Sequence, residues 1–115
     1  MFIDETTDFE LTAERLLWGK LANAGQTCLA PDYILCSITT ETQLLMAIQK
    51  TLVKFYPMKT GDPTNSYKDL GRIVNVSHFR RLNSALERSH GTVSIGGKRD
   101  ETTLFFQPTV VGMLL

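Results

Sequence analysis

The segment Tyr33-Ile34-Leu35-Cys36-Ser37-Ile38, followed at once by Thr40-Glu41-Thr42-Gln43, decides the fold class of this chain. The first part is a continuous apolar run that is too short for a helix, which is typical of a buried strand in a parallel sheet. The second part has the form of a capping box, in which a threonine oxygen accepts a free amide of the first helical turn. A strand that leads into a helix predicts an α/β arrangement.

Helical spacing of apolar residues is clear on both sides of this segment. Before it, Thr7-Asp8-Phe9-Glu10 has the form of another capping box, and the pattern predicts a helix over about residues 8–23 that ends at Gly25. The apolar stripe of that helix is Phe9, Ala13, Leu16, Leu17, Leu21 and Ala24. After the segment, a second helix with Leu44, Ile48, Leu52 and Phe55 on one face should stop near Tyr56, before Pro57.

The second half of the chain predicts a loop, a third helix and short strands. Glycine, proline and asparagine mark residues 57–70 as a loop, and Phe79, Leu82 and Leu86 mark a helix that Gly91 closes. We expect strands at residues 92–95 and 103–106, with Gly96-Gly97 as the turn, and the pair Phe2-Ile3 can end a further strand. The order of elements predicts parallel-type strands joined by crossover helices.

Composition excludes several classes of protein. The 115 residues fit one domain at most, and 12 basic residues balance 12 acidic ones, which leaves no electrostatic footprint for nucleic acid or an anionic membrane. The acidic start gives no secretory signal, and no apolar run is long enough to span a membrane, so we expect a cytoplasmic protein. Cys28 and Cys36 are eight positions apart, which fits neither a redox pair nor a zinc site, so we expect free thiols and no metal.

Cys28 is the residue best suited to take part in a chemical reaction. It follows the glycine that ends the first predicted helix and precedes the predicted strand, and such connections often carry functional sites. A thiolate there is a strong nucleophile. A lone cysteine is, however, more often a small buried apolar residue, so from the residues alone both roles stay open.

The surroundings of Cys28 resemble the cysteine signature of aldehyde dehydrogenases, in the form Leu21-x-Asn23-x-Gly25-Gln26-x-Cys28-x-Ala30. Further blocks, in the family's order, resemble its class 3 and fatty aldehyde dehydrogenase branch. They are Arg15-x-x-Trp18-Gly19-Lys20, Asn23 to Cys28, Ala30 to Leu35, Phe55-Tyr56, Gly71 to Asn75 with His78-Phe79 and Arg81-Leu82, Gly96-Gly97 with Asp100-Glu101, and Pro108-Thr109-Val110. The resemblance runs from Phe2 to Val111 and implies that residues 1–115 are a fragment of the catalytic domain of the aldehyde dehydrogenase fold.

The resemblance implies NAD(P)-dependent oxidation of aldehydes to carboxylic acids, with medium- or long-chain or aromatic aldehydes as substrates. Cys28 would be the nucleophile, and its backbone amide would help hold the oxyanion. The thiohemiacetal would give hydride to the nicotinamide, and water would then hydrolyse the thioester with a general base. The resemblance also implies NAD or NADP bound mostly by residues outside this chain, a homodimer, and membrane anchoring as an option for a full-length parent.

Other residues are expected to support the structure. Asn23 and Gln26 either fix the thiol through hydrogen bonds or stabilise an ordinary turn, and both readings stay open. We expect Trp18, beside the apolar stripe of the first helix, to have a packing role more than contact with substrate. We expect Cys36 to be an inert core residue in the middle of a strand, and His78 and His90 to lie at the surface.

The family's other machinery lies outside the matched blocks. Its general-base glutamate, in a Glu-Leu-Gly-Gly-Lys block, precedes the position of Phe2, and its oxyanion asparagine and glycine-rich cofactor turn lie further upstream. A ribose-contacting glutamate follows the position of Leu115. We therefore expect the 115 residues alone to be inactive, with apolar faces exposed. The alternative is a truncated isoform or pseudogene product that acts through a full-length partner. A thiol-based redox protein using Cys28 is a third reading, which leaves the other blocks unexplained.

Overall fold

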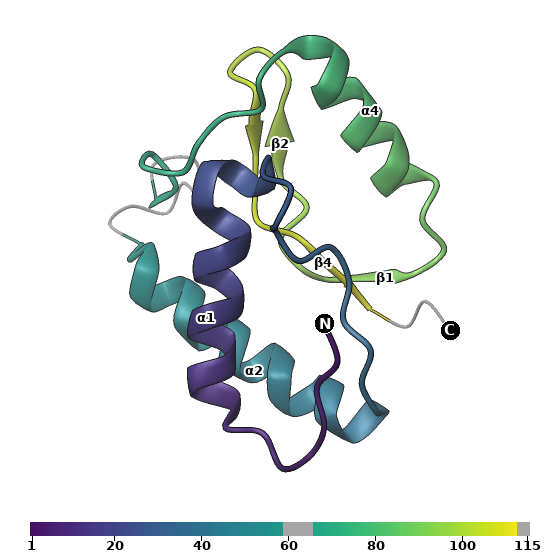
Figure 1. Cartoon of the computed structure of the whole chain (residues 1–115). Helices are drawn as coiled ribbons and strands as arrows, with labels where there is room; N and C mark the ends of the chain where they lie inside the picture. The colour runs from purple at the N-terminus through teal and green to yellow at the C-terminus, as the bar shows by residue number, and fades with distance from the viewer. Residues whose placement is uncertain (59–65, 113–115) are drawn as a thin grey trace.

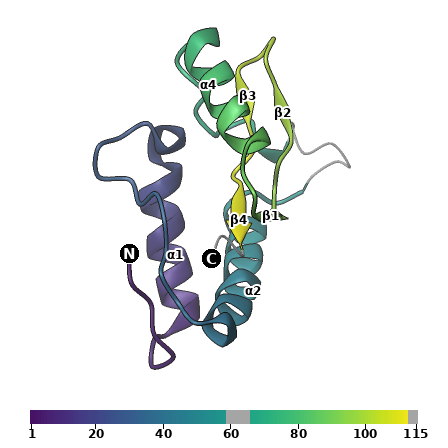
Figure 2. The same ribbon diagram turned by 90° about the vertical axis from the view of Figure 1, so that its right-hand side faces the viewer.

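Helices dominate the computed structural model, which describes residues 1–58 and 66–112. The elements in chain order are α1 (Phe9–Leu21), the 3₁₀ helix η1 (Ala22–Gly25), α2 (Ile38–Phe55), α4 (Val76–Glu87), β1 (Thr92–Ile95), β2 (Arg99–Asp100), β3 (Phe105–Phe106) and β4 (Val110–Gly112). Figures 1 and 2 show α1 beside α2 at one end of the molecule and α4 beside β2 and β3 at the other, with β1 and β4 between them. The predicted α/β class is confirmed.

The main core forms where α1 packs against α2. It contains the middle part of both predicted apolar stripes, with Phe9 and Leu21 partly buried against it and Phe55 exposed. The buried residues of this core are Ile3, Ala13, Leu16, Leu17, Leu44, Ala47, Ile48 and Leu52. Two exposed ion pairs, Lys50 with Glu10 and Lys54 with Glu14, join the helices outside this core. Exposed pairs contribute about 0–1 kcal/mol each, so the buried stripes hold the two helices together.

The caps of these two helices differ from the predicted ones. Asp8, not Thr7, caps α1, because its Oδ1 accepts the amide of Leu11 at 3.1 Å. Ser37 caps α2, and its Oγ accepts the amide of Thr40 at 3.2 Å. The capping boxes at Thr7 and Thr40 are therefore wrong. Both actual caps are preferred cap residues with extended backbone conformation, and Thr40 is instead buried inside α2.

The strand predicted at residues 33–38 is reduced to one parallel bridge between Phe2 and Leu35. The amide of Ile3 donates to the oxygen of Leu35 at 3.1 Å, and the amide of Leu35 donates to the oxygen of Met1 at 2.9 Å. The parallel direction agrees with the prediction, but the length does not, because Ile38 already belongs to α2. With a single short neighbour among the described residues, this segment has too few partners to form a longer ladder.

Strands β1 to β4 form one long antiparallel hairpin with a kink, and not the parallel-type arrangement that was predicted. β1 pairs with β4, and β2 pairs with β3, so the chain runs out through β1 and β2 and returns through β3 and β4. Gly96 and Gly97, at φ +79° and +102°, bend the outgoing strand. The predicted turn at this pair is therefore wrong: the chain reverses later, at residues 101–104, where the amide of Leu104 donates to the oxygen of Glu101 at 3.4 Å.

Helix α4 packs against the tip of this hairpin. The Oδ1 of Asn75 caps it by accepting the amide of His78 at 2.9 Å, and buried Phe79 lies 5.6 Å from Phe106 between ring centroids. The helix ends at Glu87, where the amide of Arg88 caps it by donating to the oxygen of Ser84, and so stops before the predicted end at Gly91. Of the predicted loop at 57–70, residues 59–65 lie outside the described residues, and Tyr67 and Leu70 pack on Phe105 in a second small core.

Candidate functional site

Cys28 lies exposed on the loop that follows η1. The chain leaves α1 through Asn23, Ala24 and Gly25, whose φ angles are +52°, +55° and +77°. Three successive residues in the left-handed region, two of them not glycine, reverse the backbone sharply at an energetic cost that other contacts must offset. A short turn, in which the amide of Ala30 donates to the oxygen of Thr27 at 3.1 Å, then surrounds Cys28.

Two reciprocal hydrogen bonds hold this reversal in shape. The Nδ2 of Asn23 donates to the backbone oxygen of Gln26 at 3.2 Å, and the Nε2 of Gln26 donates to the backbone oxygen of Asn23 at 2.9 Å. Gln26 also reaches a distant segment: its Nε2 donates to the oxygen of Arg72 at 3.0 Å, and its Oε1 accepts the amide of Val74 at 2.8 Å. Both amide side chains therefore stabilise the turn, and whether they also fix the thiol stays a prediction.

Close packing supports the loop from its other sides. Lys20 and Asp32 form an ion pair at 3.1 Å that joins the end of α1 to the residues after Cys28. A β-carbon at Gly71 would lie 3.4 Å from the backbone of Asn23 and of Ala24, so segment 71–74 runs directly against the reversal. The position of Cys28 thus depends on segments that are far apart in the sequence.

Arg72 fixes the segment that Gln26 contacts, and the sequence reading missed it. Its Nη1 donates to the backbone oxygens of Tyr67 at 3.2 Å and of Leu70 at 2.9 Å, and its guanidinium lies 5.0 Å from the ring centroid of Phe105. The next amide, of Ile73, donates to Leu104 at 3.0 Å. The sequence signal for this role is the block Gly71-Arg72-Ile73-Val74-Asn75. It resembles a block of the family, but the sequence alone gave it no structural role.

Cys36 has a different environment from Cys28. It is half-buried and packs against the core between α1 and α2. Burial first, and the negative charge of Glu41 second, raise the pKa of its thiol above the ordinary value. The expected packing role agrees with this environment, although Cys36 does not lie in a strand.

The two cysteines should therefore differ in their reaction with iodoacetamide. We expect Cys28 to be labelled first at neutral pH, because its side chain is exposed and thiolate is the reacting species. A raised pKa keeps Cys36 protonated to higher pH, so its labelling should accelerate only as the pH rises. Peptide mass spectrometry of a labelling time course measures both rates. Equal rates at neutral pH, or faster labelling of Cys36, would contradict this difference in environment.

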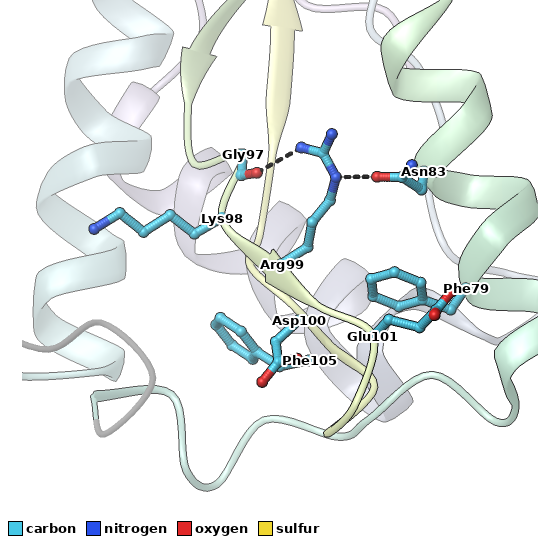
Figure 3. A pocket seen from close by; sticks show the side chains of 8 residues that line it. All are labelled: Phe79, Asn83, Gly97, Lys98, Arg99, Asp100, Glu101 and Phe105. Carbon is cyan, nitrogen blue, oxygen red and sulfur yellow. Dashed lines mark hydrogen bonds between the residues drawn. The ribbon is translucent and has the colours of Figure 1, made fainter.

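Two hollows lie elsewhere on the described surface, and Cys28 lines neither of them. The larger, of about 700 Å³, is open and lies between α4 and the β2–β3 part of the hairpin. Figure 3 shows Arg99 spanning it, with hydrogen bonds to Asn83 and to the oxygen of Gly97. The smaller, of about 270 Å³, is lined by Trp18 and Phe55 among others.

Two of the remaining expectations have opposite outcomes. Trp18 lies beside the buried stripe of α1, but it is 76% exposed and outside the core, so the described residues do not give it the expected packing role. His78 and His90 are exposed, as expected. In residues 1–58 and 66–112 there is no cluster of three or more side chains suited to a metal, and no helix long and apolar enough to cross a membrane.

Comparison with known proteins gives consistent matches over nearly the whole chain. The Aldehyde dehydrogenase family matches residues 1–114. The chain is 43% identical over 110 residues to aldehyde dehydrogenase family 3 member B1 of Homo sapiens, which covers 96% of this chain and 22% of that protein. It is 40% identical over 111 residues to 4,4'-diaponeurosporen-aldehyde dehydrogenase of Staphylococcus aureus, with coverages of 96% and 23%. A Bos taurus relative, "Aldehyde dehydrogenase, dimeric NADP-preferring", is 38% identical to this chain over 110 residues, and the match covers 44% of that relative's length.

Solved structures agree with these sequence matches. The substrate-bound state of Staphylococcus aureus AldH superimposes with a TM-score of 0.85 at 39% identity, covering 96% of this chain and 23% of that one. A betaine aldehyde dehydrogenase from the same organism, in complex with NAD⁺, superimposes with a TM-score of 0.74 at 26% identity and the same coverages. The chain thus spans less than a quarter of both solved chains.

Proposed function

The chain belongs to the aldehyde dehydrogenase family, and from this premise we propose that residues 1–115 are a catalytic-domain segment whose Cys28 is the nucleophile of NAD(P)-dependent aldehyde oxidation. The observation that carries the proposal is the exposure of Cys28 on a loop that is held by side-chain hydrogen bonds of Asn23 and Gln26. A nucleophile must be reachable by substrate and also keep one orientation, and this loop provides both conditions.

In the proposed reaction the Cys28 thiolate adds to the carbonyl carbon of an aldehyde. A carbon–sulfur bond forms, and the electron pair of the carbonyl moves onto oxygen, where the backbone amide of Cys28 would donate a hydrogen bond. A hydride acceptor bound outside the described residues would take the hydride from the thiohemiacetal and leave a thioester on Cys28, which water would hydrolyse to the carboxylic acid and the free thiol. The sum is aldehyde, oxidised cofactor and water going to carboxylic acid, reduced cofactor and one proton.

NAD or NADP supplies the oxidant in this proposal, but the described residues do not form a cradle for a dinucleotide. Such a cradle needs a glycine-rich turn that opens a helix, so that backbone amides face the phosphates. Here the first turns of α1, α2 and α4 are capped by the side chains of Asp8, Ser37 and Asn75 instead. We therefore assign no residue of this chain to the cofactor and propose that other parts of the parent polypeptide bind it.

The substrates proposed are medium- or long-chain or aromatic aldehydes, and the parent polypeptide is proposed to be cytoplasmic or membrane-anchored. Relatives support the chemical class through their names, which specify aldehydes as substrates. A homodimer is proposed as well, supported by the bovine relative that is called dimeric.

An assay of the purified polypeptide that carries this chain tests the proposal. We expect NAD or NADP to be reduced only when an aldehyde is added, with an equal amount of carboxylic acid formed. Complete alkylation of Cys28 beforehand should abolish the reduction, because the nucleophile is then blocked. Undiminished turnover after complete alkylation of Cys28, or reduction without aldehyde, would overturn the proposal.

A further inference from the structure

We propose that Gln26 is a positioning residue whose carboxamide joins the Cys28 loop to the segment Arg72–Val74 and so keeps the sulfur in one orientation. The inference rests on the proposed role of Cys28 as nucleophile. Gln26 would act through the loop, without touching substrate, and its removal would change the rate of reaction more than the binding of substrate.

The carboxamide of Gln26 makes three hydrogen bonds, which together tie the Cys28 loop to other backbone segments. The carboxamide nitrogen donates to two backbone oxygens, of Asn23 at 2.9 Å and of Arg72 at 3.0 Å. The carboxamide oxygen accepts the amide of Val74 at 2.8 Å. A carboxamide has two donor hydrogens, and both are used here. Two of the three bonds reach across 46 and 48 positions of sequence.

The contact with residues 72 and 74 copies the pairing of a neighbouring strand. In a parallel ladder the amide and the carbonyl of one residue both bond to the next strand. The amide donates to the carbonyl before a given residue of that strand, and the carbonyl accepts the amide after it. Gln26 pairs in the same way with the oxygen of Arg72 and the amide of Val74, on either side of Ile73. The side chain therefore replaces a rung that the backbone of the cysteine loop cannot supply, because it is bent away by its left-handed residues.

The far end of this tie is firmly held. The amide of buried Ile73 donates to the oxygen of Leu104 at 3.0 Å. The guanidinium of Arg72 lies over the ring of Phe105 and donates to the backbone oxygens of Tyr67 and Leu70. The near end is only two residues from Cys28 and is locked by the bonds between Asn23 and Gln26. A shift of Gln26 would thus move the loop with respect to the rest of the structure and turn the sulfur with it.

A purely structural role, in which Gln26 only stabilises the fold, makes different predictions. It would lower the amount of folded protein, with turnover per folded molecule unchanged. A positioning role lowers kcat per folded molecule and leaves KM nearly constant, because a misplaced nucleophile reacts slowly with substrate that still binds. Two substitutions that each change only the carboxamide group of Gln26 can separate these roles.

The experiment compares Gln26→Met, Gln26→Glu and the parent polypeptide in the aldehyde oxidation assay. Methionine keeps the length but removes all three hydrogen bonds, and we expect kcat to fall about 10- to 100-fold with KM within about twofold. Gln49→Met, at an exposed position of α2, is the matched control and should leave both constants unchanged. Melting temperatures of all variants measure the folded fraction.

Gln26→Glu adds a readout that a structural role would not give. Its ionised carboxylate would face the oxygens of Asn23 and Arg72, whereas the protonated acid can donate to one of them again. The charged groups on adjoining elements are Lys20 and Asp32, which pair with each other, and Arg72, which points to Tyr67 and Leu70. We expect the rate per folded molecule, relative to the parent, to rise as the pH falls for Gln26→Glu and to stay flat for Gln26→Met.

The outcomes distinguish the two proposals from each other. Full kcat in Gln26→Met, together with an inactive Cys28→Ser variant, would overturn the positioning role alone. Full activity in Cys28→Ser would overturn the proposed function itself. If Gln26→Met fails to fold, the pH series of Gln26→Glu decides: a rising relative rate supports the positioning role, and a flat one overturns it.

Discussion

Cys28→Ser should lower kcat/KM for aldehyde oxidation by about a thousandfold or more in the polypeptide that carries this chain. The substitution replaces one sulfur by oxygen at an exposed position, so it leaves the fold intact. A serine hydroxyl ionises far less readily than a thiol and is a much weaker nucleophile without an adjacent base. Removal of a nucleophile commonly costs several orders of magnitude in rate. Steady-state kinetics with a saturating cofactor measures the loss.

Cys36→Ser is the matched control for this substitution. The side chain is half-buried against the core between α1 and α2, and we expect rates within about twofold of the parent together with a lower melting temperature. Equal losses of activity in the two variants, at equal folded fractions, would show that Cys28 has no special role.

Gly96→Ala should destabilise the folded chain by about 3 kcal/mol or more, an effect larger than most single substitutions produce. A β-carbon at Gly96 would lie 2.0 Å from the backbone oxygen of Pro108 and 2.9 Å from its carbonyl carbon. The φ angle of +79° adds strain for any residue with a β-carbon. The contacting atoms are backbone, so relief would require β1 and β4 to separate. Chemical denaturation followed by circular dichroism gives the free energy of unfolding.

Gly97→Ala is the comparison that isolates the clash. Gly97 also has a positive φ, of +102°, but the nearest atom to its added β-carbon would be Cγ1 of Val93 at 3.4 Å. We expect a loss of about 1–2 kcal/mol from backbone strain alone. If the two variants lost the same stability, close approach of Pro108 would not be the reason that Gly96 is required.

The sequence was most informative where structure depends on near neighbours. The stripes Ala13-Leu16-Leu17 and Leu44-Ile48-Leu52 predicted both long helices and the core between them, because helical periodicity is a local property. The strand at Thr92–Ile95 was predicted as well. Caps were less certain, since Thr7 and Asp8 are both capping residues and only backbone geometry selects Asp8.

Features that depend on distant partners could not be predicted. The length of the strand at residues 33–38 is set by its single neighbour among the described residues, at Phe2, and the position of the kink that bends the C-terminal hairpin depends on how Gly96 approaches Pro108. At the site, Cys28 was identified from its family motif, but the contacts of Gln26 with Arg72 and Val74 cross more than 45 residues. No local pattern specifies such a pairing, and the exposure of Trp18 likewise depends on what packs beside α1.

The identity of the residue that carries the acyl group during turnover tests the role of Cys28 most directly. The polypeptide is mixed with an aldehyde and oxidised cofactor, quenched in acid, which preserves thioesters, and digested for peptide mass spectrometry. We expect the mass of the acyl group on the peptide that contains Cys28, only when aldehyde and cofactor are both present, and none on the peptide that contains Cys36. Turnover with the acyl group on another residue, or with Cys28 unmodified throughout, would contradict the assignment.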